Sequence, residues 1–458
     1  MKTIEEILAG KPEDIVGELK EKAIKVPSWE DLRKEYDPKE HPVMTDSTYT
    51  DVVDEEGGVE KVTRITQDLQ RLAAKRTSEL CFGIPVKRVY KAITEGEKSI
   101  AQYIEAILQR NRIDSVNIER GNMLFAGCEV ATLWFAIERP NNLYGFESKL
   151  KLRCRNYSPM LGDSIYPLFD EYNDMIALSF GYKRKVGGKE AEYLDVYTDS
   201  FHIRYKKEDS WIEELREQTT IGKIPGVYVH RLTPAWEDTS NIVYEIEWAL
   251  SRNGNYLRKN SKPLFVVFAD EDIQVGYEGS EKKEFKAVFQ YPKGSQASYV
   301  TWEQAIENLK FYTAELRQSF FTQLQLPDMS YENMKSTPMS GESRKAMFVD
   351  AQLKVKDESG RLLEMLDREV NVVKAFLKTM LPLNTHKDID SLQVETIITP
   401  FNITDDKDTI TNIMTATGGK AVMSQREGVE NLGWSDDVDK TMKQMAEESI
   451  GDVFEPTM

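Results

Sequence analysis

The chain has 458 residues, of which 77 are Asp or Glu and 60 are Lys or Arg, so its formal net charge is −17. A chain of this length exceeds one ordinary hydrophobic core and predicts two or three structural units. The charge excludes a histone-like or repressor-like protein, because such proteins bind DNA by releasing counterions to Lys and Arg.

The sequence contains no segment that points to a membrane. No apolar run is long enough to cross a bilayer. The N-terminus lacks the basic-then-apolar order of a signal peptide, and its spacing indicates an amphipathic helix instead. We therefore expect the chain to fold in the cytoplasm.

The cysteines and histidines are scattered without the spacing of a metal site or a disulfide framework. They are Cys81, Cys128, Cys154, His41, His202, His230 and His386. Gly-containing strings at 186–190 and 417–421 lack the first glycine and the hydroxyl residue of a phosphate-binding loop. H-E-x-x-H and G-x-S-x-G motifs are also absent. We expect no metal, no cofactor and no enzymatic activity.

The first half of the chain predicts an arm and then a mixed domain. Residues 1–60 are polar with short helical patches and indicate an arm with little core. Residues 61–112 are predicted to be helical, with an apolar face at Ile65, Leu69 and Leu72. From about residue 122, period-two alternation between turn residues is typical of strands. The strand-like segments are MLFAGCEVATLWFAIE, KLKLRCRNY, MIALSFGYKRK, YLDVYTD and FHIRYKK.

Helices return in the second half. Residues 236–260 form one predicted helix, which Asn253 and Gly254 weaken. Two strand-like pieces follow, PLFVVFAD and FKAVFQY. Thr301 and Gln304 then match a capping box at the start of a second strong helix.

The C-terminal third predicts a loop, a long helix, a strand and an acidic tail. Residues 326–341 are rich in loop-forming Pro, Asn and Gly. The next helix is very long, and Gly360 is its expected bend. After the strand LQVETIITPF, the helical tail from residue 403 has twelve Asp plus Glu against five Lys plus Arg, so its net charge is −7 (5 − 12).

This order of elements resembles the tailed-bacteriophage portal proteins of the siphophage type, which connect head and tail. The resemblance covers roughly residues 60–450 and depends on an ordered set of phrases. They are RTSELCFGIPVKR, SPMLGDSIYPLFDEYNDMIALSFGYKRK, YLDVYTDSFHIRYKK, IPGVYVHRLTPAWEDTSNIVYEIEWAL and TPMSGESRKAMFVDAQLKVKD.

The resemblance implies an α+β portal fold with a wing, a helical stem, a small β-containing clip, a tunnel loop, a long bent helix and a short helical crown. The implied segments are 1–60 for the N-terminal arm, 61–235 for the wing, 236–260 for a stem helix, 261–301 for the clip, 302–325 for a second stem helix, 326–341 for the tunnel loop, 342–404 for the long bent helix and a wing strand, and 405–458 for the crown.

The implied function is a ring of about twelve copies at one capsid vertex of the virion, assembled in the host bacterial cytoplasm. Double-stranded DNA would pass through the ring during packaging and ejection. The implied partners are terminase, a head–tail adaptor, the major capsid protein and a scaffold, with no membrane. About twelve chains of −17 would carry roughly −200 charges, which favours sliding of DNA over adhesion.

Three sets of residues are candidates for this function, and each has a simpler alternative. The tunnel-loop residues Met329, Asn333, Met334, Lys335 and Ser336 face DNA or belong to a surface connector. The clip residues Lys282, Lys283, Lys286 and Lys293 dock a partner or protect an exposed strand edge. The stem residues Trp302, Ile306, Leu309, Tyr312, Leu316 and Phe320 pack between subunits or within a monomer.

Two other functions stay open from the sequence. One is another virion structural or connector protein, which need not have the helix–insertion–helix–loop–long-helix order. The other is a metal-dependent nuclease, because metal-binding carboxylates need not be adjacent in sequence.

Overall fold

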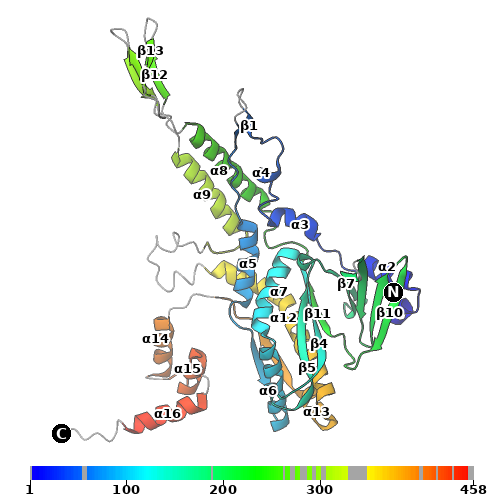
Figure 1. Ribbon diagram of the computed structural model, residues 1–458. Helices are drawn as coiled ribbons and strands as arrows, with labels where there is room; N and C mark the ends of the chain where they lie inside the picture. The colour runs from blue at the N-terminus through cyan, green and yellow to red at the C-terminus, as the bar shows by residue number, and fades with distance from the viewer. Residues whose placement is uncertain are drawn as a thin grey trace, which may run out of the picture. The chain divides into compact units, whose positions relative to one another are not determined.

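The structure is a computed structural model. It describes residues 3–53, 59–186, 189–260, 264–268, 274–278, 286–290, 296–300, 306–328, 348–401, 406–418, 421–435 and 438–451. The chain forms two compact units and enters each of them more than once (Figure 1). Unit 1 comprises Met1–Arg76, Asn122–Trp134 and Cys154–Leu324, and unit 2 comprises Thr77–Gly121, Phe135–Arg153 and Gln325–Met458. The mixture of helices and strands confirms the α+β class.

Unit 1 begins with short helices and contains an antiparallel five-stranded sheet of order β10-β9-β8-β7-β6. The helices are α1 (Ile4–Leu8), α2 (Pro12–Lys22), α3 (Trp29–Tyr36) and α4 (Pro42–Thr45), and a small pair of strands follows, β1 (Val52–Val53) and β2 (Val59–Glu60). The sheet strands are β6 (Ser164–Phe169), β7 (Met175–Val186), β8 (Lys189–Tyr197), β9 (Phe201–Lys207) and β10 (Trp211–Gln218), and the short 3-10 helix η1 (Pro159–Leu161) precedes them.

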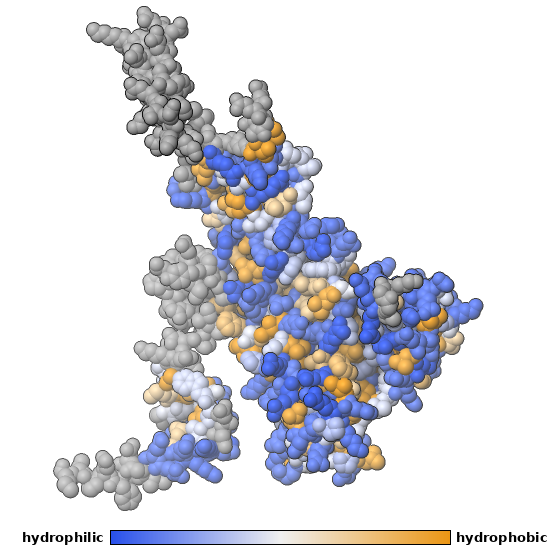
Figure 2. Space-filling model, viewed as in Figure 1, coloured by the Kyte–Doolittle hydropathy of each residue, from blue (hydrophilic) through white to orange (hydrophobic). Residues whose placement is uncertain are grey.

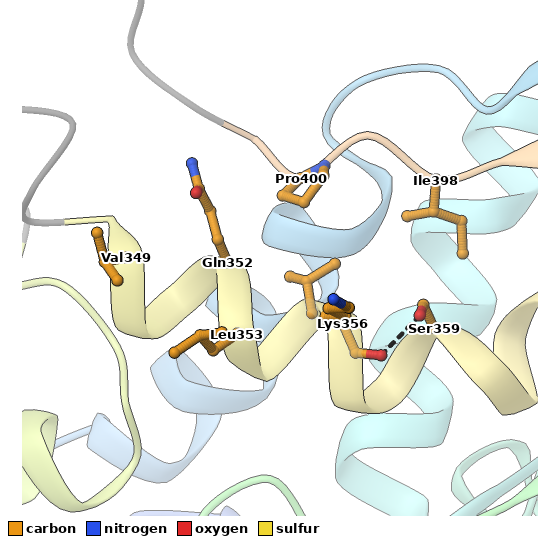
Figure 3. Close-up of a pocket in the computed structure, with 8 residues that line it drawn as sticks. Val349, Gln352, Leu353, Lys356, Ser359, Ile398 and Pro400 are labelled. Atoms are coloured by element: carbon orange, nitrogen blue, oxygen red, sulfur yellow. Dashed lines mark hydrogen bonds between the residues drawn. The ribbon is translucent and has the colours of Figure 1, made fainter.

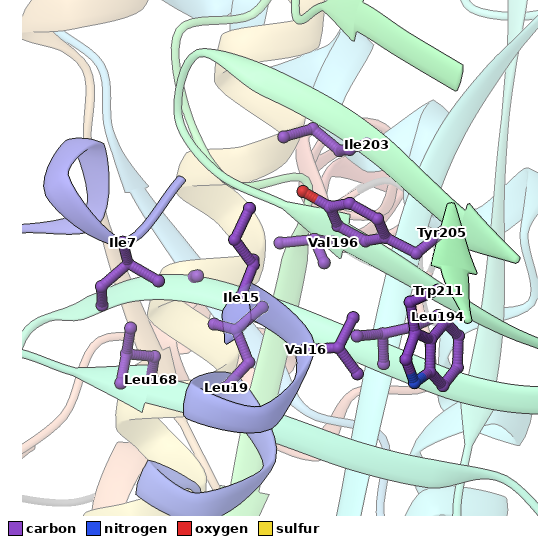
Figure 4. Packing of buried hydrophobic residues seen from close by; sticks show 11 residues of the cluster. Ile7, Ile15, Val16, Leu19, Leu168, Leu194, Val196, Ile203, Tyr205 and Trp211 are labelled. Atoms are coloured by element: carbon purple, nitrogen blue, oxygen red, sulfur yellow. The ribbon is translucent and has the colours of Figure 1, made fainter. Parts of the chain in front are cut away.

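One face of this sheet is covered by α2, whose apolar residues Ile15, Val16 and Leu19 lie on one side of the helix. They are buried against sheet residues that include Leu194 and Tyr205 (Figure 4). Each such side chain contributes about 1.5–3 kcal/mol through burial. The expectation that residues 1–60 have little core is therefore wrong, because α1 and α2 supply four of the eleven buried residues of this cluster.

The opposite face of the sheet packs on a second group of strands. The three-stranded sheet has the order β11-β4-β5, with β4 at Glu129–Asn141, β5 at Ser148–Tyr157 and β11 at Gly226–His230. Leu178 and Phe180 of β7 share their cluster with Leu133 of β4 and Tyr228 of β11. Because side chains alternate along a strand, β7 contributes to both cores.

Two long helices of unit 1 flank a β-hairpin region. Helix α8 spans Ser240–Asn260 and α9 spans Ile306–Gln323. Between them lie β12 (Leu264–Phe268), β13 (Gln274–Glu278), β14 (Lys286–Gln290) and β15 (Gln296–Val300). Strand β12 pairs with β15, and β13 pairs with β14. The sequence predicted only two strands here, so β13 and β15 were missed.

Unit 2 is mainly helical. Helix α12 (Val349–Met380) runs unbroken through Gly360 and buries one apolar side, including Leu362, Leu366 and Val373. Helices α5 (Leu69–Phe82) and α7 (Ile113–Gly127) connect the two units along the chain. The other elements are β3 (Lys87–Lys91), α6 (Glu95–Arg110), α12 (Val349–Met380), η2 (Leu383–Thr385), α13 (His386–Ser391), β16 (Gln393–Ile397), α14 (Asp406–Thr417), α15 (Gln425–Leu432) and α16 (Val438–Gly451). Strand β16 pairs with β3 in an antiparallel manner.

Two further expectations from the sequence are wrong. Residues 61–68 are not helical, since α5 begins at Leu69. Residues 123–127 belong to helix α7 and not to a strand, and Cys128, with a φ of 63°, follows the helix before β4 begins. Among the described residues, no helix is both long enough and apolar enough to span a membrane.

Candidate functional site

The long helices α8 and α9 of unit 1 form a pair that carries exposed apolar side chains. The two helices pack on each other, and the Tyr312 hydroxyl donates to Glu245 Oε1 at 3.1 Å (Figure 1). Burial changes along α9: Phe320 and Phe321 are buried, whereas Phe311 is 68% exposed and Tyr312 is 43% exposed.

Helix α8 also presents an apolar residue to solvent, because Leu257 is 50% exposed. The surface of this part of the molecule shows hydrophobic residues among hydrophilic ones (Figure 2). Large exposed side chains such as Phe311 and Leu257 lose hydration only when another surface covers them. The pair is therefore a candidate contact surface for another protein chain.

A buried ion pair anchors α8 to the N-terminal segment. His41 Nδ1 lies 2.7 Å from Glu247 Oε1, and both side chains are fully buried. The other ring nitrogen, Nε2, lies 2.8 Å from the carbonyl oxygen of Glu35. A carbonyl only accepts, so Nε2 carries a hydrogen and donates to it; when Nδ1 is also protonated, His41 is an imidazolium that donates to the Glu247 carboxylate.

The pKa of His41 reflects this arrangement. Burial alone would lower it, but the hydrogen bonds to Glu247 and to the Glu35 carbonyl, with the charges of Glu247 and Asp68, outweigh burial and raise the pKa above its usual value. The fold therefore favours the charged form of His41 more than solvent does. The ring of Tyr244 packs edge-on against the imidazole at 5.3 Å.

The extended segment 62–67, here called the strap, runs along α8 in register with it. The backbone N–H of Thr63 donates to Asn255 Oδ1 at 2.5 Å. The N–H of Ile65 donates to Ser251 Oγ at 2.8 Å, and the N–H of Gln67 donates to Glu247 Oε1 at 2.7 Å. Side chains of α8 thus satisfy alternate amides of the strap.

The register has a geometric cause. Two residues of extended chain advance about 6.6 Å, and four residues of helix advance about 6.0 Å. Every second strap amide therefore meets every fourth residue of α8, which places 63, 65 and 67 opposite 255, 251 and 247. The strap therefore contacts α8 from Glu247 to Asn255. Because Glu247 also contacts His41, the ion pair and the strap are linked through one carboxylate.

Gly254 has a role in this contact. A Cβ atom at Gly254 would lie 2.7 Å from Thr63 Cγ2, closer than real Cβ contacts. The helix continues through Asn253 and Gly254, so this glycine allows the strap to approach and does not interrupt α8. From the sequence alone, Gly254 was interpreted only as a residue that weakens the helix.

The structure places the predicted site residues as follows. On α9, Phe320 is buried, Leu309 and Leu316 are half-buried, Tyr312 is exposed, and Ile306 is the first residue. Lys286 is the first residue of β14. The other predicted residues lie outside the described residues: Trp302, Lys282, Lys283, Lys293, Met329, Asn333, Met334, Lys335 and Ser336.

A pocket of about 400 Å³ lies in unit 2, along the first half of α12 (Figure 3). Its wall is mostly apolar, with Val349 and Leu353 on α12 and Ile398 and Pro400 after β16. The Ser359 hydroxyl donates to the Lys356 carbonyl within the helix at 2.6 Å. The lining residues that the structure describes include no carboxylate and no imidazole.

Titratable groups elsewhere do not gather into a metal site in the described part of the chain. No group of three or more His, Cys, Asp or Glu side chains is placed to bind a metal ion there. Cys81 and Cys128 are buried thiols, and Cys154 is half-buried. Burial raises the pKa of Cys128 to about 12, which keeps its thiol protonated at neutral pH.

Comparison with known proteins gives a family. The family described as "Phage portal protein, SPP1 Gp6-like" matches residues 19–453. A chain in the neck of an empty gene transfer agent particle is 9% identical, with a TM-score of 0.41 over 80% of this chain and 89% of that chain. A chain in the virion of a native gene transfer agent particle is 11% identical, with a TM-score of 0.37 over 89% and 94%. No curated protein sequence matches.

Proposed function

This chain belongs to the SPP1 Gp6-like family of phage portal proteins, and from this premise we propose that its copies form a closed ring at one vertex of a phage capsid. The ring, of about twelve copies, is the conduit for double-stranded DNA during packaging and ejection. The protein is then a structural component of the virion, assembled in the bacterial cytoplasm, and not an enzyme.

The exposed apolar side chains of the α8–α9 pair carry this proposal. Phe311 and Tyr312 on α9 and Leu257 on α8 are large, and each is at least 43% exposed. In a closed ring each subunit contacts the next through two different surfaces, head to tail. A helix pair with outward apolar residues supplies one such surface, and burying Phe311 alone would contribute about 1.5–3 kcal/mol per subunit.

We assign the remaining segments by the same premise. Ranges 236–260 and 302–325 form the stem, 261–301 form the clip, 326–341 form the tunnel loop and 405–458 form the crown. The wing comprises 61–235 with the strand after the long helix, and 1–60 form the arm. Lys335 and its neighbours in the tunnel loop touch the DNA backbone through weak, salt-screened contacts.

The partners follow from position in the particle. The lysines of the clip (Lys282, Lys283, Lys286 and Lys293) face an acidic surface of the terminase motor or of the head–tail adaptor, since complementary charge guides docking. The outer part of the ring contacts the major capsid protein and, during assembly, a scaffold protein.

The ring is tested with the purified full-length chain. Negative-stain images and sedimentation velocity are expected to show a ring with a central hole. Phe311→Asp places a charge in the subunit contact and is expected to shift the protein towards monomers. Tyr172→Asp is the matched control, because Tyr172 is also an exposed aromatic residue (79%) but lies in the turn between β6 and β7.

The outcomes separate the alternatives. Monomers or two-fold dimers of the unmodified chain would end the ring proposal. Rings that form equally well with Phe311→Asp would remove α9 from the subunit contact. For the tunnel loop, a photoreactive residue at position 335 is expected to cross-link to packaged DNA, and the absence of adducts would contradict that assignment.

A further inference from the structure

Strand β5 carries a row of positive charges on one face. Lys149, Lys151 and Arg153 occupy alternate positions of the strand, so their side chains point to the same side. Lys149 and Arg153 are exposed, and Lys151 is half-buried. The intervening residue Leu152 is buried, which directs the cationic side of the strand to solvent.

Two further cations lie next to this row within unit 2. Arg139 is on β4, the neighbour of β5 in the sheet. Arg110 ends α6, which lies beside the β4–β5 connection (Figure 1), as the ring contact between Tyr103 and Phe146 at 4.8 Å shows. We call Arg110, Arg139, Lys149, Lys151 and Arg153 the cationic face.

Three charges of the cationic face act on a fourth, Lys151. The positive charge of Arg153 is the largest cause of a lowered pKa for Lys151, followed by burial and by the charges of Arg139 and Arg110. In the part of the chain that the structure describes, none of the five forms an ion pair with a carboxylate. The cationic face is therefore an uncompensated positive region on a chain with a net charge of −17.

A second run of cations, on β7, differs from the cationic face because carboxylates lie opposite it. On β7, Lys183 and Lys185 lie directly opposite Glu192 and Glu190 of β8. Those cross-strand pairs stabilise the sheet and reduce the local charge. In the described part of the chain the cationic face has no such ion-paired partner, so counterions or an anionic ligand would relieve its mutual repulsion.

We propose that the cationic face binds the phosphate backbone of duplex DNA, without reading its sequence. This inference rests on the proposed function, which brings DNA to the protein, and it adds a contact separate from the expected tunnel loop at 326–341. The ligand must be a polyanion, because five cations that form no ion pair in the described part of the chain gain most from the release of counterions by closely spaced phosphates.

The geometry of the row favours DNA over an acidic protein surface. Alternate positions of a strand are about 6.8 Å apart, so the three cations of β5 extend over about 14 Å. Duplex DNA advances about 3.4 Å for each phosphate of one strand, and the row therefore spans about four base pairs. A protein interface, by contrast, is depleted in lysine at its centre.

The test uses the full-length assembled protein and a short fluorescein-labelled DNA duplex of arbitrary sequence. Affinity is measured by anisotropy at several salt concentrations. The triple variant Lys149→Gln, Lys151→Gln, Arg153→Gln is compared with the triple variant Lys183→Gln, Arg184→Gln, Lys185→Gln. Both variants lose two lysines and one arginine, so their changes in net charge are equal. Sedimentation velocity checks that each variant assembles as the unmodified protein does.

Each phosphate contact contributes about −0.9 to the slope of log K against log salt. The variant of the cationic face is expected to reduce the magnitude of this slope by about 2.7 and to bind at least about tenfold more weakly at low salt. The β7 variant is expected to retain both the slope and the affinity.

Equal slopes for the two triple variants, or no binding by the unmodified protein at low salt, would overturn the proposal. Retention of an acidic protein in place of DNA would overturn it in favour of a protein partner. The test distinguishes this inference from the proposed function. If the protein forms rings but the β5 variant binds DNA as the β7 variant does, only the inference is contradicted. If the protein is monomeric but the β5 variant binds DNA more weakly, only the ring is contradicted.

Discussion

The imidazole of His41 lies 2.7 Å from the Glu247 carboxylate, although the two residues are 206 positions apart and both side chains are fully buried. The fold raises the pKa of His41, so the charged pair contributes stability that is fully present below the ordinary pKa of histidine. This contribution is lost as the pH rises through the raised value. The groups that face His41 are Glu247, the Glu35 carbonyl, Asp68 and Tyr244.

The first prediction concerns His41→Gln, which removes the positive charge but keeps a polar side chain. Breaking a buried pair typically costs about 3–5 kcal/mol, because one charge is left uncompensated. We expect the loss in the free energy of unfolding to be largest near pH 5–6 and to shrink at alkaline pH. Urea unfolding of the variant and of the unmodified protein at several pH values measures the difference. A difference that is independent of pH would contradict the charged pair.

The second prediction concerns the approach of the strap to α8. Gly254→Ala would normally stabilise a helix by about 1 kcal/mol, but here the new Cβ would lie 2.7 Å from Thr63 Cγ2. We therefore expect Gly254→Ala to destabilise unit 1 by about 1–3 kcal/mol. Adding Thr63→Ser removes the clashing methyl group and is expected to restore most of the loss. Thermal unfolding of the single and double variants provides the test, and additive effects would contradict the contact.

The sequence predicted those parts of the fold that depend on local periodicity. Strands β7 and β9 coincide with alternating apolar segments, and α8 with a 3.6-residue pattern. The strap was predicted as helix because Ile65, Leu69 and Leu72 have helical spacing. Its amides instead donate to side chains of α8 that lie 180 or more positions away, as for Gln67 and Glu247. No local pattern records that contact.

Other differences have physical causes of the same kind. The end of α7 was predicted as strand because the segment from Met123 is apolar and strand-like in pattern. Leu124, Phe125 and Ala126 are all buried, and a fully buried helix end has the same apolar run as a buried strand. The candidate site was predicted only in part. The apolar stripe of α9 was evident, but which of its residues are exposed depends on the packing of α8, and the anchor at His41 had no signal in the sequence.

The third prediction concerns Glu129, a buried carboxyl group at the start of β4. Burial raises its pKa to about 7, and the hydrogen bond donated by the Tyr228 hydroxyl to Glu129 Oε2, at 2.9 Å, partly opposes this rise. Because the folded pKa exceeds the ordinary value, stability is greatest below about pH 4.5 for this group and falls as the pH rises through about 7.

Glu129→Gln removes this titration and keeps an acceptor for Tyr228. We expect the variant to be more stable than the unmodified protein at pH 8–9, by up to about 3 kcal/mol, and nearly equal to it at pH 5. Melting temperatures across this pH range measure the effect. Glu190→Gln on β8 is a suitable control, because that residue is exposed and its substitution removes the same charge. Equal shifts for both variants would show that net charge, and not the buried site, is the cause.

The fourth prediction concerns the ion pair between Arg120 of α7 and Glu369 of α12, the most buried pair of unit 2 in the described part of the chain. The guanidinium donates two hydrogen bonds to the carboxylate, at 3.0 and 2.8 Å, and both side chains are 1% exposed. Asn117 Oδ1 accepts from the same guanidinium, so the geometry of Arg120 is fixed on two sides.

Glu369→Gln leaves the Arg120 charge buried without a counter-charge, and we expect a loss of about 3–5 kcal/mol in the free energy of unfolding. The double variant Arg120→Met, Glu369→Leu replaces the pair with apolar groups of similar volume and is expected to be close to the unmodified protein, because desolvation offsets most of the attraction in a buried pair. Chemical denaturation of the three proteins decides the matter. A double variant less stable than Glu369→Gln would mean that the pair is net stabilising, and that α7 and α12 are held together chiefly by charge and not by the surrounding apolar core.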